Sequence, residues 1–245
     1  MKKIILACVA TILSLSFINA QETAEDLIVS ENMGAEYASS RPILLGVTVG
    51  ANMTTYSGDR NPKMGLGGQI GINCDIPIND YFSIMPELLF AYKTVDLDNV
   101  SWDNNNELMI MKSTDHLLYM NVPVYVKGSL HVGIGRPFIA IGPMINVGLY
   151  GENRGGDFKL LLFQADPNAG YVEYREKPPY NNLDFSVCAK AGYDFDFGLS
   201  ISVAYQLGFA NMYKMTNDRK LLYNELGLDT SQKNSTISVS LGYNF

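Results

Sequence analysis

The stretch at residues 235–245, STISVSLGYNF, is apolar at every second position from Ile237 to Phe245, and Ser, Gly and Asn stand between. Successive side chains of a β-strand point to opposite sides, so this period predicts a strand with one apolar and one small polar face. The same period recurs along the chain. It predicts strands at about 43–54, 63–77, 81–94, 114–129, 137–149, 182–195, 198–212 and 235–245.

The connections between these segments alternate in length. Short turns lie at 78–80, 131–136 and 196–197, whereas longer polar segments lie at 55–62, 95–113, 150–181 and 213–234. In an up-and-down meander, alternate connections lie at opposite ends of the sheet. We therefore expect all the long loops at one end and all the short turns at the other.

The residues of the polar face indicate which face is outside. Charged residues are only 18% of the chain, and neither 200–208 nor 236–244 contains one. Small neutral side chains suit the interior of a narrow barrel, and the apolar face then meets lipid. A soluble lipocalin-like barrel, with its apolar face inside, is the alternative. The few charges on the polar face can pair across the interior: Glu87, Lys93, Lys127, Asp184 and Lys190.

Aromatic residues gather toward both ends of the predicted strands. Tyr81, Phe82, Tyr193, Phe195, Tyr243 and Phe245 lie toward the short turns, and Tyr92, Tyr205 and Phe209 lie nearer the long loops. Two aromatic bands are typical of a barrel that meets two membrane interfaces. Membrane strands need about 9–11 residues, and each of these segments has that many or a few more. The pattern predicts an all-β fold, an eight-stranded antiparallel up-and-down transmembrane β-barrel.

The first 20 residues have the pattern of a signal peptide. Met1, Lys2 and Lys3 precede an apolar run at 4–18, and Asn19-Ala20 offers a cleavage point before Gln21. Residues 21–41 are acidic and lack a clear period, which predicts a flexible periplasmic N-terminal segment. The barrel domain is then 42–245, exported through the inner membrane to the outer membrane of a Gram-negative bacterium.

Six segments, which together extend over about 42–245, are GVTVGANMT, PELLFAYK, YMNVPVYVKGSL, RPFIAIGPMINVGL, LDFSVCAKAGYDF and the final LGYNF. They resemble motifs of the PorT-like outer-membrane β-barrel family of Bacteroidetes. The resemblance implies an outer-membrane barrel. The family takes its name from a protein linked to type IX secretion and gliding, but most members have no assigned activity, so membership does not imply that role.

Candidate catalytic residues are few. His116 follows Asp115 near the long-loop end, and His131 lies in a short turn. A hydrolase or acyltransferase needs a histidine, a carboxylate and a nucleophile that converge, whereas adjacent residues of a strand point to opposite faces. We therefore predict no catalytic residue. The alternative is an outer-membrane enzyme with a loop-rim active site around His116.

We also predict no cofactor and no metal site. GLGGQIG at 65–71 lies inside a strand pattern and opens no helix, which argues against a phosphate-binding loop. Four carboxylates at 95–113 could ligate a hard cation, but their spacing is not that of an EF-hand and favours a solvated loop. They are Asp96, Asp98, Asp103 and Glu107. With a net charge of −7, the chain is not expected to bind nucleic acid.

These observations favour a non-catalytic integral outer-membrane protein that displays surface loops for partner contact, anchoring or adhesion. Within the longest loop, FKLLLFQADPNAGYVEY is apolar enough to pack or to extend the strands above the membrane. Trp102 is a candidate contact for a protein partner. The other expected partners are membrane lipid and the outer-membrane insertion machinery, which would read Phe245. A narrow small-solute channel is the remaining alternative.

Overall fold

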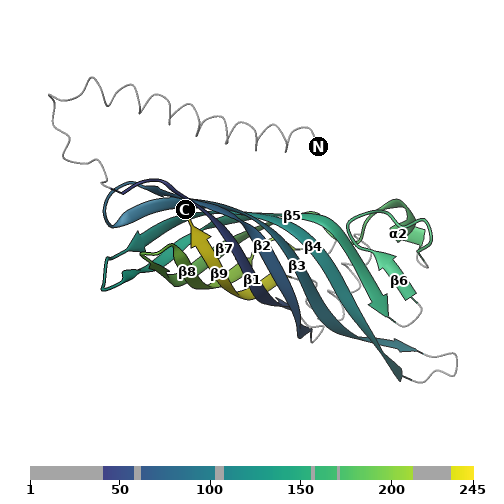
Figure 1. The fold of residues 1–245 in the computed structure, drawn as a ribbon. Coiled ribbons are helices and arrows are strands. Elements are labelled where there is room, and N and C mark those ends of the chain that lie inside the picture. The colour runs from purple at the N-terminus through teal and green to yellow at the C-terminus, as the bar shows by residue number, and fades with distance from the viewer. Residues whose placement is uncertain (1–40, 58–61, 103–107, 156–157, 170–171, 212–232) are drawn as a thin grey trace. The chain divides into compact units, whose positions relative to one another are not determined.

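The chain forms a closed β-barrel in the computed structural model, which describes residues 41–57, 62–102, 108–155, 158–169, 172–211 and 233–245 (Figure 1). The described elements are β1 (Leu44–Ser57), β2 (Lys63–Pro77), β3 (Phe82–Trp102), β4 (Leu108–Ser129), β5 (Gly135–Gly155), β6 (Phe158–Leu161), α2 (Val172–Glu176), β7 (Leu183–Phe195), β8 (Leu199–Gly208) and β9 (Lys233–Asn244). The predicted signal peptide and segment 21–40 lie outside the described residues.

Eight of these strands close the ring. β1, β2, β3, β4, β5, β7, β8 and β9 pair antiparallel in that order, and β9 pairs with β1. β6 pairs with the last four residues of β5, beyond the ring. The predicted eight-stranded antiparallel barrel is confirmed, and its closure leaves no open sheet edge within the ring.

The pairing of β9 with β1 follows from the alternation in both strands. Val49 lies opposite Leu241, Ala51 opposite Val239, and Met53 opposite Ile237, so apolar residues face apolar residues along the seam. A slip of one residue would turn Ser and Gly outward and the apolar set into the lumen. The hydrophobic pattern therefore fixes the register at which the barrel closes.

The apolar face lies outside, as predicted for a membrane barrel. Outward side chains include Val47, Val49, Met53, Leu66, Ile70, Ile72, Ile84, Phe90, Val124, Val126, Ile139, Ile141, Phe185, Val187, Ile201, Val203, Val239 and Leu241, all of them well exposed. The inward set includes the five charged residues expected to pair inside. The outward apolar runs of β3 and β5 end at Tyr92 and Tyr150, and we take the membrane-spanning part to lie below these residues.

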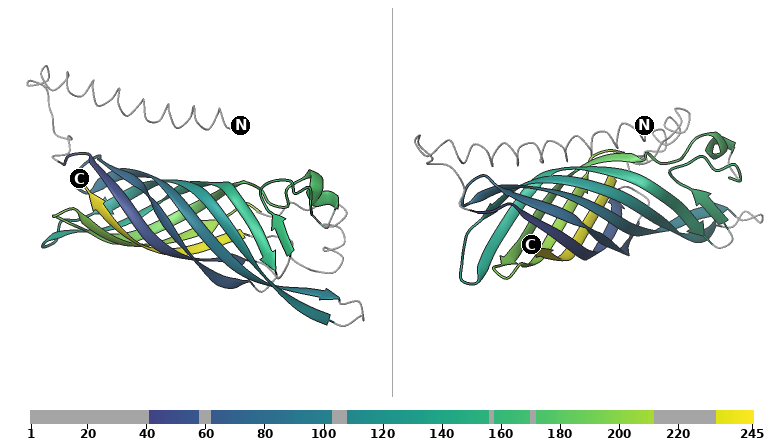
Figure 2. Two further views of the ribbon diagram at one scale, coloured as in Figure 1. Left: turned by 45° about the vertical axis from the view of Figure 1, so that its right-hand side comes forward. Right: turned by 45° about the horizontal axis from the view of Figure 1, so that its top comes forward.

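The C-terminal end of β9 lies beside the N-terminal end of β1. The Phe245 amide donates to the Leu45 carbonyl at 2.7 Å. β6 and α2 lie at the opposite end of the barrel, which we call the long-loop end (Figure 2). None of the helices in the described part of the chain is long and apolar enough to cross a membrane.

Three strands run further toward the long-loop end than their apolar patterns predict. β3 continues to Trp102 and β4 begins at Leu108, so most of the predicted loop 95–113 is a hairpin. β5 likewise continues to Gly155 instead of ending near 149. The inward period persists there, with Val95 and Leu97 buried, but the outward residues become polar, as at Asp96. Loss of the apolar outward face made these extensions look like loops.

Candidate functional site

The lumen near the short turns is occupied by a buried cation between two carboxylates. Lys127 Nζ lies 2.5 Å from Asp75 Oδ2 and 2.6 Å from Asp194 Oδ2, and the lysine side chain is 2% exposed. Arg41 lies 3.7 Å from the same Asp75 oxygen. Asp75, Lys127 and Asp194 come from β2, β4 and β7, so the contacts cross the lumen.

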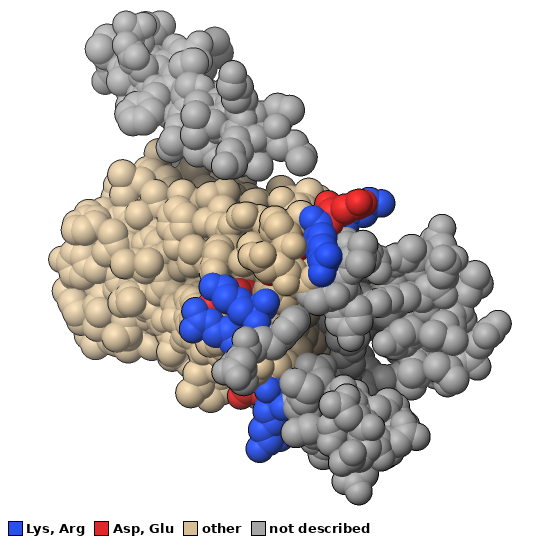
Figure 3. Space-filling model, turned by 90° about the vertical axis from the view of Figure 1, so that its right-hand side faces the viewer, with Lys and Arg blue, Asp and Glu red and all other residues tan. Residues whose placement is uncertain are grey.

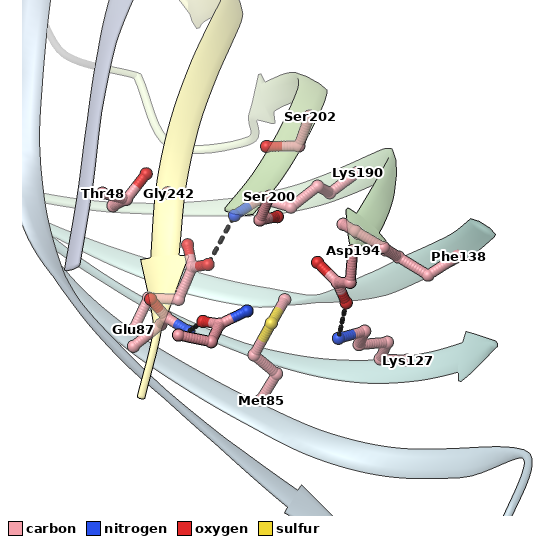
Figure 4. Close-up of a pocket in the computed structure, with 12 residues that line it drawn as sticks. Thr48, Met85, Glu87, Lys127, Phe138, Lys190, Asp194, Ser200, Ser202 and Gly242 are labelled. Carbon is pink, nitrogen blue, oxygen red and sulfur yellow. Dashed lines mark hydrogen bonds and ion pairs between the residues drawn. The ribbon is translucent and has the colours of Figure 1, made fainter. Parts of the chain in front are cut away.

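A second ion pair fills the next level of the lumen. Lys190 Nζ lies 2.5 Å from Glu87 Oε1 and 5.0 Å from the centre of the Tyr125 ring. Figure 4 shows this pair beside the Lys127–Asp194 pair, around a pocket of about 20 Å³. A cavity of that volume holds about one water molecule. The described side chains therefore leave no room at this level for a larger solute.

The middle of the lumen carries a hydrogen-bond network around Lys93. Its ammonium donates to Gln206 Oε1 at 2.9 Å and to Thr236 Oγ1 at 3.2 Å. Gln206 in turn donates to Ser186 Oγ at 3.0 Å and to Asn146 Oδ1 at 3.2 Å. These buried groups are on β3, β5, β7, β8 and β9, so the network connects most of the ring. Such hydrogen bonds offset the cost of burying the charge of Lys93 and the polar groups around it.

Asp115 is the buried acceptor at the long-loop mouth. Tyr180 Oη donates to its Oδ2 at 2.8 Å, Tyr56 Oη donates to the same oxygen at 3.1 Å, and Asn153 Nδ2 donates to Oδ1 at 2.7 Å. Tyr180 lies in the connection between β5 and β7. Asp115 therefore fastens that connection to the inner face of the barrel.

An aromatic cluster closes the mouth above the lumen. The Phe163 ring lies 5.4 Å from Tyr119 and 6.4 Å from Tyr180, both in edge-on arrangements. It sits against Gly148 and Gly151, where an added Cβ would come within 2.6 Å and 2.8 Å of the ring. Glycine at these two positions provides the space for Phe163.

The chain around Phe163 forms a small folded unit, the described residues of 158–180, which we call the cap. The Leu162 amide donates to the Gly151 carbonyl at 2.8 Å, and the Tyr180 amide donates to Leu162 at 3.0 Å. Asp166 accepts from the Leu161 amide at 3.2 Å. Backbone and side-chain bonds thus hold the cap to β5. The stretch was expected to pack or to extend the strands. It packs against the barrel and contributes the short strand β6 beside β5, whereas β7 begins only at Leu183.

The outer face beside the cap carries a cluster of charges. Glu152 lies under Tyr150, Arg154 and Lys159, and its side chain is 4% exposed. The Lys159 ammonium lies 2.7 Å from Glu152 Oε2. Burial alone would raise the pKa of Glu152. The contacts with Lys159 and Tyr150 and the charge of Arg154 outweigh that effect and lower the pKa to about 2.

Basic side chains are prominent at this end of the molecule. Figure 3 looks onto the long-loop end and shows Lys and Arg in separate groups around the barrel, with fewer Asp and Glu. Exposed basic residues there include Lys63, Lys112, Arg154, Lys159, Arg175, Lys177 and Lys233. Exposed carboxylates there include Asp96 and Glu176, so exposed cations outnumber exposed carboxylates among the residues described at this end.

The two histidines lie apart from the lumen. His116 faces outward on β4, and its Nδ1 lies 2.6 Å from Tyr92 Oη, with the two rings stacked. Asp115 faces inward and is fully buried. The structure thus places these neighbours on opposite faces of the strand. His131 lies in the turn before β5, with its Nε2 3.4 Å from Asp196 Oδ1.

The structure describes the backbone of two of the four carboxylates in the predicted loop 95–113. Asp96 is on β3 and accepts from Thr114 Oγ1 at 2.7 Å. Asp98 also belongs to β3, whereas Asp103 and Glu107 lie outside the described residues. Trp102 is the last residue of β3. Among the residues that the structure describes, no group of three or more His, Cys, Asp or Glu is arranged to hold a metal ion.

Sequence reasoning missed several residues of this site. Asp194 continues the inward period of Asp184, Ser186, Cys188 and Lys190, so the pattern could have identified it. The cap residues Phe163 and Tyr180 had no such signal, because their partners are distant in the sequence and depend on how the connection folds. Glu152 lies in the predicted loop 150–181, where no strand period indicates that its side chain is buried.

A comparison of the chain with protein-family models gives a match. The family model described as "Outer membrane protein beta-barrel domain" matches residues 19–214. No curated protein sequence matches the chain significantly.

Several solved barrels are similar in structure. Neisserial surface protein A shares 9% identity at a TM-score of 0.42, covering 84% of this chain and 100% of its own. Ail of Yersinia pestis shares 9% at 0.40, with 84% and 100% covered. OprG of Pseudomonas aeruginosa shares 11% at 0.38, with 85% and 98% covered.

Proposed function

The chain belongs to the family of outer membrane protein beta-barrel domains, and from this premise we propose that it is a non-catalytic integral protein of the outer membrane. Its role is to display the long-loop end as a surface for partner contact, anchoring or adhesion. A rigid barrel that carries exposed loops is a common arrangement for such recognition.

The filled lumen is the observation that carries this proposal. Lys127 and Lys190 form ion pairs at successive levels of the lumen, Lys93 is hydrogen-bonded further along, and Phe163 belongs to the buried aromatic cluster at the mouth. A solute would have to break buried pairs and displace the cap to pass. The interior of an eight-stranded barrel is narrow enough for side chains to fill it. The long-loop end is therefore the surface best suited to function.

The proposed route to the membrane uses both ends of the sequence. Residues 1–20 act as a signal peptide that carries the chain through the inner membrane. The insertion machinery then recognises the last strand through Phe245, and the short turns remain in the periplasm. This orientation is supported by the lengths of the connections, because outer-membrane barrels have short periplasmic turns and longer extracellular loops. The exposed aromatic rings Tyr81, Phe82, Phe197, Tyr243 and Phe245 are typical of a membrane interface at the short-turn end.

Within the family, we propose that the chain is PorT-like, on the motifs that it shares with that group in Bacteroidetes. A subunit role in type IX secretion is one form that partner contact could take. Crosslinking of outer membranes followed by recovery of the tagged protein tests it. Co-recovery of other secretion subunits supports that role, and recovery with unrelated surface proteins contradicts it.

Planar-bilayer recording of the purified full-length protein tests display against conduction. We expect no stepwise conductance from the native protein. A matched variant, Lys63→Gln, changes a rim charge outside the lumen and should also be silent. Regular conductance steps from the native protein would contradict the proposal and favour the small-solute channel.

A further inference from the structure

We propose that the outer face of β4, β5 and β6, just beyond the membrane-spanning part, binds the phosphate of a phosphorylated lipid in the outer leaflet. The patch consists of Lys112 and His116 on β4, Glu152 and Arg154 on β5, and Lys159 on β6. The inference rests on the proposed membrane orientation, and it adds the chemistry of one partner.

The two central cations stand side by side on neighbouring strands. Arg154 lies directly opposite Lys159 in the pairing of β5 with β6. Both contact Glu152, yet their side chains remain 60% and 55% exposed. Glu152 has two oxygens, whereas a guanidinium carries five donors and an ammonium three. Donors on both cations are therefore available to an anion arriving from outside.

The buried carboxylate holds this arrangement in place. Glu152 is covered by its neighbours, and Tyr150 Oη also donates to it. Its low pKa keeps it ionised at neutral pH, so it restrains both long side chains before any ligand arrives. Restraint of this kind reduces the entropy lost on binding. Paired Arg and Lys donors suit a phosphate, which accepts several hydrogen bonds at once.

The neighbouring strand β4 adds one formal cation, Lys112, to the patch. Thr114 lies opposite Arg154, and His116 lies opposite Glu152, in the β4–β5 pairing. Lys112 is exposed one outward step beyond Thr114. On β4, β5 and β6 the patch has three formal cations against one carboxylate, Glu152. On the adjacent β3, Asp96 lies opposite Thr114 and Asp98 opposite Lys112. The excess of cations therefore lies toward β5 and β6, where Arg154 and Lys159 are paired, and there it favours an anionic partner.

The position of the patch favours a lipid over a free anion. Below it on the same strands, the outward residues become apolar, with Leu118 on β4 and Ile145 on β5 exposed. Tyr150 lies between the apolar and charged levels. A molecule with an acyl chain and a phosphate headgroup can contact both levels at once. A dissolved phosphate ion contacts only the cations.

Native mass spectrometry of the full-length protein in micelles provides the test. The probes are diphosphorylated lipid A, the same lipid with its phosphates removed, and inorganic phosphate. We expect the diphosphorylated lipid to bind, and Arg154→Gln with Lys159→Gln to weaken it roughly tenfold, since two charge-assisted contacts are lost. The control, Lys63→Gln with Lys233→Gln, makes the same charge change at the same end and should bind normally.

Three results would overturn the proposal. They are equal binding of the lipid without phosphates, equal weakening by the control pair, and complete competition by inorganic phosphate at matched concentration. If the Gln pair fails to fold, Arg154→Lys with Lys159→Arg keeps both charges and should retain lipid binding. Loss of binding in that folded variant also counts against the site. The planar-bilayer recording distinguishes failure of this proposal from failure of the display proposal. A protein that neither conducts nor binds the lipid contradicts only the phosphate site.

Discussion

Replacing Lys127 with Met is expected to destabilise the barrel, because it leaves two carboxylates facing one another in the lumen. Lys127 contacts Asp75 at 2.5 Å and Asp194 at 2.6 Å. At an effective dielectric constant of about 20, each contact is worth roughly 6 kcal/mol of Coulomb attraction before desolvation is counted. Removing one partner from a buried pair typically costs about 3–5 kcal/mol.

The lower end of that range applies here. Asp194 is 17% exposed, and the neighbouring pocket has room for water, so solvent partly screens the remaining carboxylates. We expect Lys127→Met to lower the free energy of unfolding by about 3 kcal/mol. The assay is urea-induced unfolding in lipid vesicles, followed by circular dichroism and by the mobility difference between folded and unfolded protein on a gel.

Two matched variants complete this experiment. Lys112→Met removes an exposed cation and should change stability by less than about 0.5 kcal/mol. Lys127→Met combined with Asp75→Asn and Asp194→Asn removes Lys127 and both carboxylates that contact it. It should recover part of the loss, since the two carboxylates no longer face one another and Arg41 alone keeps its charge beside position 75. If Lys127→Met is as stable as the native protein, or if the triple variant is no better than the single one, the reasoning is refuted.

Four further outcomes are expected. Phe163→Ala should open the cap, costing about 3 kcal/mol, so that limited proteolysis between β5 and β7 becomes about a hundredfold faster; unchanged protection would argue against a packed cap. Because the folded pKa of Glu152 is depressed to about 2, its stabilising effect on the cap is complete above about pH 4.5 and is lost as pH falls toward 2. Glu152→Gln should remove that dependence of protease protection, and a persisting dependence would implicate other groups. His116→Ala should leave lipid and peptide turnover by outer membranes unchanged, whereas lost turnover would favour the enzyme alternative. Deleting Phe245 should reduce assembled protein in the outer membrane, and unaltered levels would contradict its role in insertion.

The barrel itself was predictable because one physical rule applies at every residue of the ring. A period of two defines two faces, and the small polar residues between Ile237 and Phe245 identify the inner one. The same rule placed Glu87 and Lys190 inside, where they form an ion pair. It did not identify the partners of Lys127, because the pattern along one strand does not tell which levels of distant strands coincide.

The long-loop end was harder to predict because its outward residues meet water. The outward residues there, such as Asp96 and Thr114, are polar. The alternation of an apolar outer face with a small polar inner face, by which the membrane strands were recognised, is therefore lost. The cap depends on contacts such as Phe163 with Gly148 and Gly151, which join a connection to a strand through space. Only the folded chain brings these groups together.

The most direct test of display is the orientation of the barrel in intact cells. In a background of Cys74→Ser and Cys188→Ser, single cysteines at Lys159 and Asp196 probe the long-loop and short-turn ends, where these residues are 55% and 54% exposed. With a membrane-impermeant maleimide, Lys159→Cys should be labelled on whole cells, and Asp196→Cys only after the cells are lysed. Labelling of Asp196→Cys but not of Lys159→Cys on whole cells would contradict display of the long-loop end at the surface.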